Sequence, residues 1–142
     1  IVWARHNPLS LPGKGIPWCS SFISWVLDQA GIQAPRTASS QYWRNYGTEV
    51  GIRNWEDARI NDIIVFRYNN GLGHVGFYRG YNKTTNRVNI LGGNQGDDLN
   101  IKSFSTGKVV AIKRNWTVPT AFDKPNYITV DAPSGGSYED TR

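Results

Sequence analysis

The sequence holds one cysteine and two histidines, and Cys19 and His74 stand in patterns that suit covalent acyl transfer. Cys19 follows Pro17 and opens a run in which apolar residues recur with the helical period up to Ala30. A thiol in the first turn of a helix meets the positive end of the helix dipole, and the free N–H groups there can stabilise an oxyanion. Cys19 is therefore a candidate nucleophile. The alternative is a small buried packing residue.

His74 opens a short apolar run and has glycines on both sides, at Gly73 and Gly76. Small neighbours leave room for a substrate backbone, so we expect Gly73 to contact substrate. An imidazole with a pKa near 6.5 suits a general base at neutral pH. The alternative is a turn histidine bound to a carbonyl group, and His6 in the irregular N-terminal segment has no such pattern around it.

A catalytic histidine needs a polar group that fixes its tautomer. The segment Leu91 to Asp98 offers several, and Asn94 ends a strand that should pair with the strand of His74. We expect Asn94 to orient His74, with Gln95 and Asp97 as the alternates, and we also expect Gln95 to contact substrate. The same Gly, Asn and Asp residues would form a turn whatever the function.

The pattern of apolar residues predicts an α+β fold. A helix is expected over Trp18 to Ala30 with Gly31 as its cap, and a second over Ser39 to Tyr46 before Gly47. Shorter β-branched and aromatic runs follow and predict an antiparallel sheet of about five strands with the helices packed on one face. The expected strands are Asp62 to Arg67, His74 to Tyr81, Arg87 to Leu91, Asn100 to Phe104 and Val109 to Lys113.

Prolines and glycines divide the chain into three expected parts. Residues 1–17 read as an irregular arm, residues 18–116 as the catalytic domain, and residues 117–142 as an extended C-terminal arm or linker. The chain begins with Ile1, so we expect a processed product, a part of a larger polypeptide or a component of a phage particle.

The amino-acid composition limits the classes of molecule that the protein could bind. The net charge of +5 favours an anionic partner, but the 16 Lys and Arg residues are scattered, with only Lys113 and Arg114 adjacent. This dispersion argues against nucleic acid, and the charge alone does not choose between an acidic membrane and an anionic cell wall. No apolar run approaches the roughly 20 residues that insert in a membrane. A single cysteine excludes a disulfide and a multi-cysteine metal site, and we expect no metal and no cofactor.

Several blocks together carry a family resemblance. The segment from Pro17 to Gly31 resembles the nucleophile helix of CHAP and NlpC-type peptidoglycan hydrolases, and within it Pro-Trp-Cys is typical of a CHAP-like subgroup. Further blocks of similar sequence follow in the same order: Ser40 to Gly47, Asn61 to Phe66, Gly73 to Tyr78 and Leu91 to Gln95. The resemblance runs from about Trp18 to Arg114.

The resemblance implies a papain-like core and a site built from Cys19 as nucleophile, His74 as base and Asn94 as the orienting residue. Two departures stand out. Many CHAP domains carry a glutamate where Gly92 stands, so the orienting role here is neutral or has moved. The usual Gly-Asp before the first strand is Asn61-Asp62. Some CHAP domains bind calcium through an acidic loop before the cysteine, but residues 1–17 hold no Asp or Glu, so no metal is expected there.

We therefore expect a cysteine peptidase or amidase that cleaves an amide bond of peptidoglycan, as endopeptidase or muramoyl-peptide amidase. It would act outside the cytoplasm, in the cell wall, secreted, or on a phage virion as a lysin. Trp18 and Trp43 are candidate substrate contacts, with core packing as the alternative. Two other functions stay open: a toxin or effector that deamidates or cleaves another amide, and a non-catalytic phage-tail or wall-binding module.

Overall fold

The computed structural model describes residues 18–69, 71–96, 98–115, 127–128 and 131–134. The expected N-terminal arm, residue 116, the alternate Asp97 and most of the expected C-terminal arm lie outside these residues, and the expected domain boundaries stay predictions. No helix in the described part of the chain has the length and hydropathy to cross a bilayer.

The nucleophile helix forms as predicted. Helix α2 spans Cys19–Gln29, with Trp18 as its N-cap and Ala30 as its C-cap. Gly31 follows with a φ of 77°, the left-handed conformation that favours glycine after a helix. The buried apolar side chains of α2 are Cys19, Phe22, Ile23 and Leu27. Their spacing puts one stripe of the helix against the sheet, which fixes its rotation.

The second helix is shorter and tighter than expected. The sequence predicted a short helix over Ser39 to Tyr46, and the structure has a 3-10 helix, η2, over Ser40–Asn45. Trp43 is its only buried residue, so one aromatic side chain anchors it, and short 3-10 segments are common where so little packing is available. Gly47 ends it with a φ of 63°.

The α+β prediction is confirmed, and the sheet is larger than about five strands. Its order is β1-β6-β2-β3-β4-β5, with antiparallel neighbours, and β7 runs parallel to β3. The five predicted strands are present, and two short ones add to the sheet. The strands are β1 (Thr48–Glu49), β2 (Ile63–Arg67), β3 (Gly73–Asn82), β4 (Arg87–Gly92), β5 (Asn100–Ser105), β6 (Val109–Arg114) and β7 (Tyr127–Ile128).

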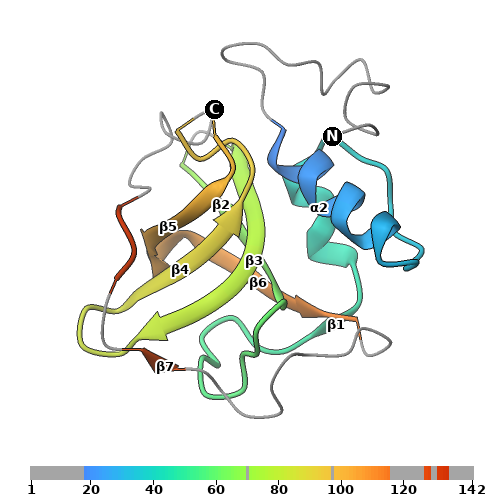
Figure 1. The fold of residues 1–142 in the computed structure, drawn as a ribbon. Coiled ribbons are helices and arrows are strands. Elements are labelled where there is room, and N and C mark those ends of the chain that lie inside the picture. Colours follow the sequence, from blue (N-terminus) through green and yellow to red (C-terminus); the bar gives the residue numbers. More distant parts are fainter. Residues whose placement is uncertain (1–17, 70, 97, 116–126, 129–130, 135–142) are drawn as a thin grey trace.

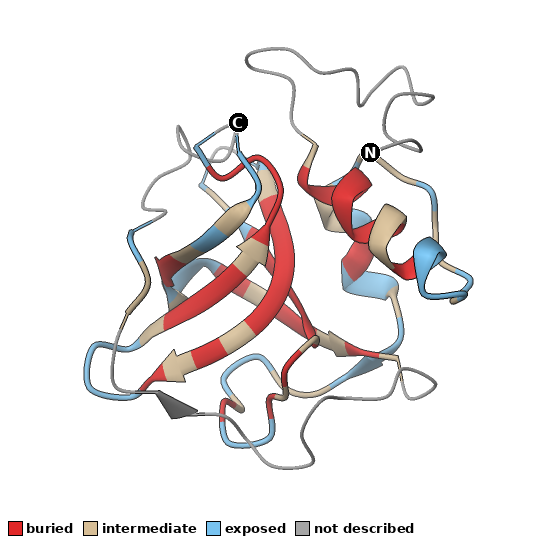
Figure 2. Ribbon diagram, in the orientation of Figure 1, coloured by how far each residue is buried: buried red, intermediate tan, exposed pale blue. Residues whose placement is uncertain are grey.

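The sheet separates two apolar clusters. Figure 1 shows α2 and η2 on one side of the curved sheet, and Figure 2 shows the buried residues concentrated on the central strands. Val75 and Phe77 of β3 belong to the cluster beneath α2, whereas Tyr78 belongs to the cluster on the other face. Because side chains alternate along a strand, β3 contributes to both clusters.

Part of the expected C-terminal arm pairs with the sheet. Strand β7 pairs with β3 at Tyr81 and Asn82, and Ser134 forms an isolated bridge with Ser103 of β5. Residues 127–128 thus lie along the end of β3, and Ser134 lies beside β5.

A buried ion pair joins the start of β2 to the end of β6. Arg114 donates from Nε and Nη2 to the two carboxylate oxygens of Asp62, at 2.8 and 2.7 Å. Asp62 is 1% exposed and also accepts from the backbone N–H of Arg59 at 2.8 Å. Asn61, where similar chains have glycine, keeps a φ of 79°. The Asp of this motif is therefore a structural anchor for the central strands.

Replacing Arg114 by leucine should lower the free energy of unfolding by about 3 to 5 kcal/mol, because the Asp62 carboxylate is left buried without its cation. The double variant Asp62→Asn/Arg114→Leu should lose less, since no charge remains buried. The partly exposed pair of Lys113 and Glu49, at 3.5 Å, is the control: Lys113→Gln should cost about 1 kcal/mol or less. Urea unfolding measures all three, and equal losses for the two single variants would contradict the assignment.

Candidate active site

The thiol of Cys19 lies where α2 meets β3. Cys19 is 3% exposed, and the backbone N–H groups of Val75, Ser20 and Cys19 itself act to lower the pKa of its thiol. The last two belong to the first turn of α2, whose N–H groups have no acceptor within the helix. The thiol thus contacts backbone donors from the helix and from the residue that follows His74.

His74 is the second residue of β3 and is fully buried. Its ring lies against Phe66 and Phe104, with centroids 6.0 and 5.4 Å away. Its Nε2 is 2.9 Å from Oε1 of Gln95. Its Nδ1 is buried and has no hydrogen-bond partner in the structure. Two aromatic rings and one amide therefore fix the imidazole and leave one nitrogen available.

Other contacts determine how the amide of Gln95 is oriented. Gln95 Nε2 lies 3.1 Å from the carbonyl oxygen of Ile90 and 2.9 Å from that of Asn100. It also lies 3.0 Å from Asn100 Oδ1. All three partners are acceptors, so the NH₂ group must face them and the oxygen must face His74.

This orientation selects the histidine tautomer. Because Oε1 of Gln95 is an acceptor, Nε2 of His74 must carry the proton and donate it. Nδ1 of the neutral ring then holds the lone pair, which is the form that a general base requires. The unpartnered nitrogen is therefore the basic one.

The two glycines after β4 bring these groups together. At Gly92 a Cβ would overlap Oε1 of Gln95 and would lie 3.2 Å from Nε2 of His74. At Gly93 it would lie 2.6 Å from the ring of Trp18. Three neighbouring pairs thus meet at one place, namely Trp18-Cys19, His74-Val75 and Gly92-Gly93. The amide of Gln95 fills the space that a side chain at position 92 would take.

Burial keeps both candidate catalytic groups neutral. Desolvation raises the pKa of the Cys19 thiol to about 11, although the N–H groups of Val75, Ser20 and Cys19 act in the opposite direction. Desolvation lowers the pKa of His74 to about 4, and the hydrogen bond that Nε2 donates to Gln95 opposes this shift. Between these values the resting pair is a thiol and a neutral imidazole.

The structure places the other expected residues as follows. Asn94 is buried and has a φ of 64°, in the turn that returns the chain toward His74. The side chain that accepts the hydrogen bond from His74 Nε2 is that of Gln95. Gln95 is itself fully buried, with its amide engaged by protein groups. Gly73 is the first residue of β3 and is half-buried. A Cβ at this position would overlap the side chain of Gln41.

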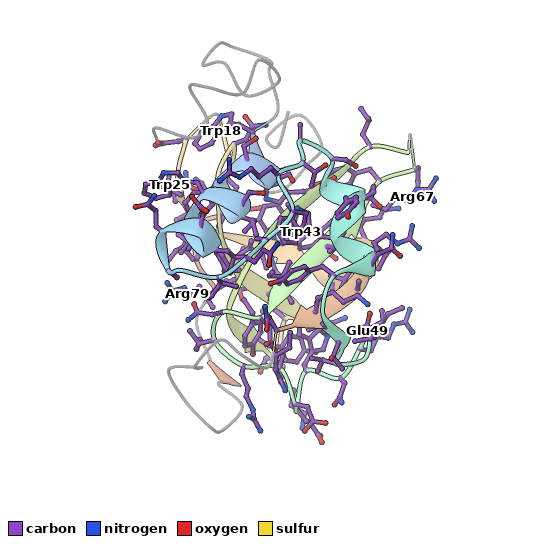
Figure 3. All side chains as sticks on the ribbon, turned by 90° about the vertical axis from the view of Figure 1, so that its right-hand side faces the viewer. Trp18, Trp25, Trp43, Glu49, Arg67 and Arg79 are labelled. Carbon is purple, nitrogen blue, oxygen red and sulfur yellow. The ribbon has the colours of Figure 1, made fainter. Side chains whose placement is uncertain are left out.

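The two tryptophans expected at the substrate differ in exposure. Trp18 is half-buried beside Cys19 and packs on Gly93. Trp43 is fully buried and donates from Nε1 to the hydroxyl of Ser20 at 2.7 Å. Figure 3 shows Trp43 between α2 and η2 and Trp18 at the N-terminal end of α2. Trp43 therefore has no exposed surface to offer a substrate, whereas Trp18 is partly exposed.

Two supporting residues were not singled out from the sequence. Asn100 binds Gln95 in both directions, since its own Nδ2 donates to the backbone oxygen of Gln95 at 2.9 Å. Gln41 donates to the carbonyl oxygen of Phe66 at 2.8 Å and lies over Gly73. Asn100 had no signal in the sequence, because its place beside Gly92 depends on the register of β4 and β5.

Within the described residues, no three His, Cys, Asp or Glu side chains gather into a group that could hold a metal ion. The groups that lie together at the candidate site are a thiol, an imidazole, an amide and backbone N–H groups.

Residues 11–94 match the family model of the CHAP domain. The chain is also similar to proteins named "Probable endopeptidase p60". That of Listeria seeligeri is 38% identical over 84 residues, which are 59% of this chain and 14% of that protein. That of Listeria welshimeri is 34% identical over 84 residues, with the same coverage of both chains. That of Listeria grayi is 28% identical over 79 residues, which are 56% of this chain and 13% of that protein.

The match thus covers only 14% of the length of the first of these relatives. The region matched by the family model is more than half of the chain and contains Cys19, His74 and Asn94. The chain therefore belongs to the CHAP domain family.

Proposed function

We propose that the chain is a cysteine-dependent hydrolase of peptidoglycan, cleaving an amide bond of the cell-wall peptide as an endopeptidase or muramoyl-peptide amidase. The observation that carries the proposal is the fixed amide of Gln95, which leaves Nδ1 of His74 free to act as a base. The next residue in β3, Val75, has its backbone N–H close to the thiol of Cys19. Family membership and the name of the Listeria relatives support the reaction class.

In the first step Nδ1 of His74 takes the thiol proton as the sulfur of Cys19 attacks the amide carbonyl carbon. A carbon–sulfur bond forms, and the oxyanion is stabilised by backbone N–H groups at the start of α2. The imidazolium then protonates the leaving amine, and the carbon–nitrogen bond breaks. The thioester that remains retains the acyl half of the substrate.

In the second step water attacks the thioester carbon and gives a proton to Nδ1. The carbon–sulfur bond breaks, the acyl half leaves as a carboxylic acid, and the imidazolium returns its proton to the sulfur. No hydrogen bond joins the thiol and the imidazole in the resting structure, since Nδ1 has no partner. Such catalytic contacts are commonly loose before substrate binds and tighten in the complex.

Gln95 takes the orienting role in this proposal, in place of the glutamate that many similar chains carry at position 92. Its amide occupies the space beside Gly92 and contacts the same imidazole nitrogen that a side chain at 92 would approach. The imidazolium would therefore form beside a neutral dipole rather than a carboxylate. Asn94 would support the turn, and its φ of 64° brings Gln95 back over β4.

The proposed substrate is the anionic cell wall, approached from outside the cytoplasm by a secreted, wall-located or phage-borne protein. Trp18 and Gly73 directly precede Cys19 and His74, and both are half-buried. The exposed Leu72, at 53%, precedes Gly73 and offers a further apolar contact. The net charge of +5 would favour association with the wall.

The principal test is incubation of purified peptidoglycan with wild type and Cys19→Ala, followed by mass spectrometry of the soluble fragments. Wild type should release fragments with new amine termini, and Cys19→Ala should be slower by on the order of a thousandfold or more, because the acyl-enzyme cannot form. Asp28→Asn, an exposed change in the same helix, is the control and should cleave as wild type does.

Two outcomes would replace the proposal. Wall binding by Cys19→Ala together with no cleavage by wild type would indicate a non-catalytic module. An intact wall together with a mass change in a protein target would indicate an effector acting on another amide.

The role of Gln95 is tested by two changes. Gln95→Leu should lower kcat by on the order of a hundredfold, because His74 loses the group that fixes its tautomer. Gln95→Glu should move the acid limb of the kcat/KM profile to higher pH, since a carboxylate beside Nε2 raises the pKa of His74 from about 4.

The matched control for Gln95 is Asn94→Gly, which removes the neighbouring side chain while suiting the φ of 64°. It should retain most of the activity. A large loss in Asn94→Gly combined with normal activity in Gln95→Leu would transfer the orienting role to Asn94.

The resting protonation state is tested by alkylating Cys19 with iodoacetamide across a pH series. A thiol with a pKa near 11 rather than 9.0 should react about a hundredfold more slowly at neutral pH than an ordinary thiol. The rate should rise with pH beyond 9, whereas the unfolded chain in urea should level off near that value. A plateau below pH 8 in the folded protein would show a thiolate–imidazolium pair at rest.

A further inference from the structure

A cavity lies at the other end of α2 from the proposed nucleophile. Its volume is about 770 Å³, and it lies between the last turns of α2 and the sheet. Cys19 begins this helix and does not line the cavity. The length of an 11-residue helix places the two ends about 15 Å apart. The cavity is thus separate from the site described above.

The walls of the cavity are mostly apolar side chains from three elements. Val26 and Leu27 come from α2, Phe77 from β3 and Leu91 from β4. Ile32, in the segment after the helix, also lines the cavity. A volume and a lining of this kind fit a small organic group rather than water or an ion alone.

Arg79 supplies the charged group in this apolar setting. It lines the cavity from β3, and its Nε is buried without a hydrogen-bond partner. Figure 3 shows Arg79 near the C-terminal part of α2, away from Trp18 at the other end. Arg79 as a whole is half-buried, and its positive charge beside apolar walls favours an anionic ligand. Arginine binds carboxylates through two parallel hydrogen bonds.

We propose that this cavity binds the C-terminal end of a short peptide, with its free α-carboxylate on Arg79 and a small apolar side chain against Phe77 and Leu91. The amide side chain of Asn61, also at the cavity, provides a polar partner for the peptide backbone. The occupant is a peptide end rather than an inorganic anion, because an inorganic anion would leave the apolar walls empty.

The inference goes beyond the proposed function and does not depend on it. Binding at Arg79 needs neither the thiol nor the imidazole. If the chain does act on cell-wall peptides, the cavity would hold a second peptide end while another is cleaved at Cys19. Binding and cleavage can therefore fail separately.

The test is an NMR titration of the full chain with N-acetyl-D-alanyl-D-alanine and with its C-terminal amide. The acid should shift the backbone signals of Phe77 and Leu91 and should bind about tenfold more tightly than the amide, because only the acid carries the charge. Arg79→Gln should weaken binding of the acid by a similar factor, and Arg79→Lys should be intermediate because lysine lacks the planar fork.

Two controls make the result specific. Arg67→Gln removes one positive charge from an exposed position on β2 and should leave the affinity unchanged. Cys19→Ala should also bind as wild type does. Equal binding of acid and amide, no saturable shift, or equal affinity for inorganic phosphate would each overturn the proposal, and the first two need only the wild-type chain.

Discussion

The hydrogen bond between Gln95 and His74 is the contact on which the rest of the site depends. It sets which imidazole nitrogen carries the proton, but only because carbonyl oxygens of Ile90 and Asn100 hold the amide in one orientation. Those carbonyls belong to β4 and β5, whose pairing is continuous from Arg87 to Gly92. The protonation state of one side chain is therefore determined by the register of two strands.

The rest of the fold serves to bring three loops to this point. The apolar stripe of α2 sets the helix rotation and directs the thiol at Val75, while the Asp62–Arg114 pair fixes β2 against β6. The site also depends on two positions that have no side chain, Gly92 and Gly93. Gly92 admits the amide of Gln95, and Gly93 admits the ring of Trp18. A side chain at either position would displace a group of the proposed site.

Much of this arrangement was predictable from the sequence. The limits of α2 followed from a helical period bounded by Pro17 and Gly31, and five strands followed from short β-branched runs, because these signals are local. The 3-10 form of η2 was not predictable, since it depends on how Trp43 packs. The sequence limited the hydrogen-bond partner of His74 to residues near Asn94. The choice between Asn94 and Gln95 could not be made, because it depends on the left-handed conformation at Asn94, which determines which side chain faces β3.

The neutrality of the buried pair has a consequence for the response to ionic strength. Cys19 and His74 carry no net charge over a wide pH range, so dissolved ions have no charged group to screen at the resting site. In the described part of the chain, six of the twelve Lys and Arg residues are exposed and only Arg114 is buried. Added salt would consequently weaken the encounter with an anionic polymer while leaving the bond-breaking event itself almost unaffected.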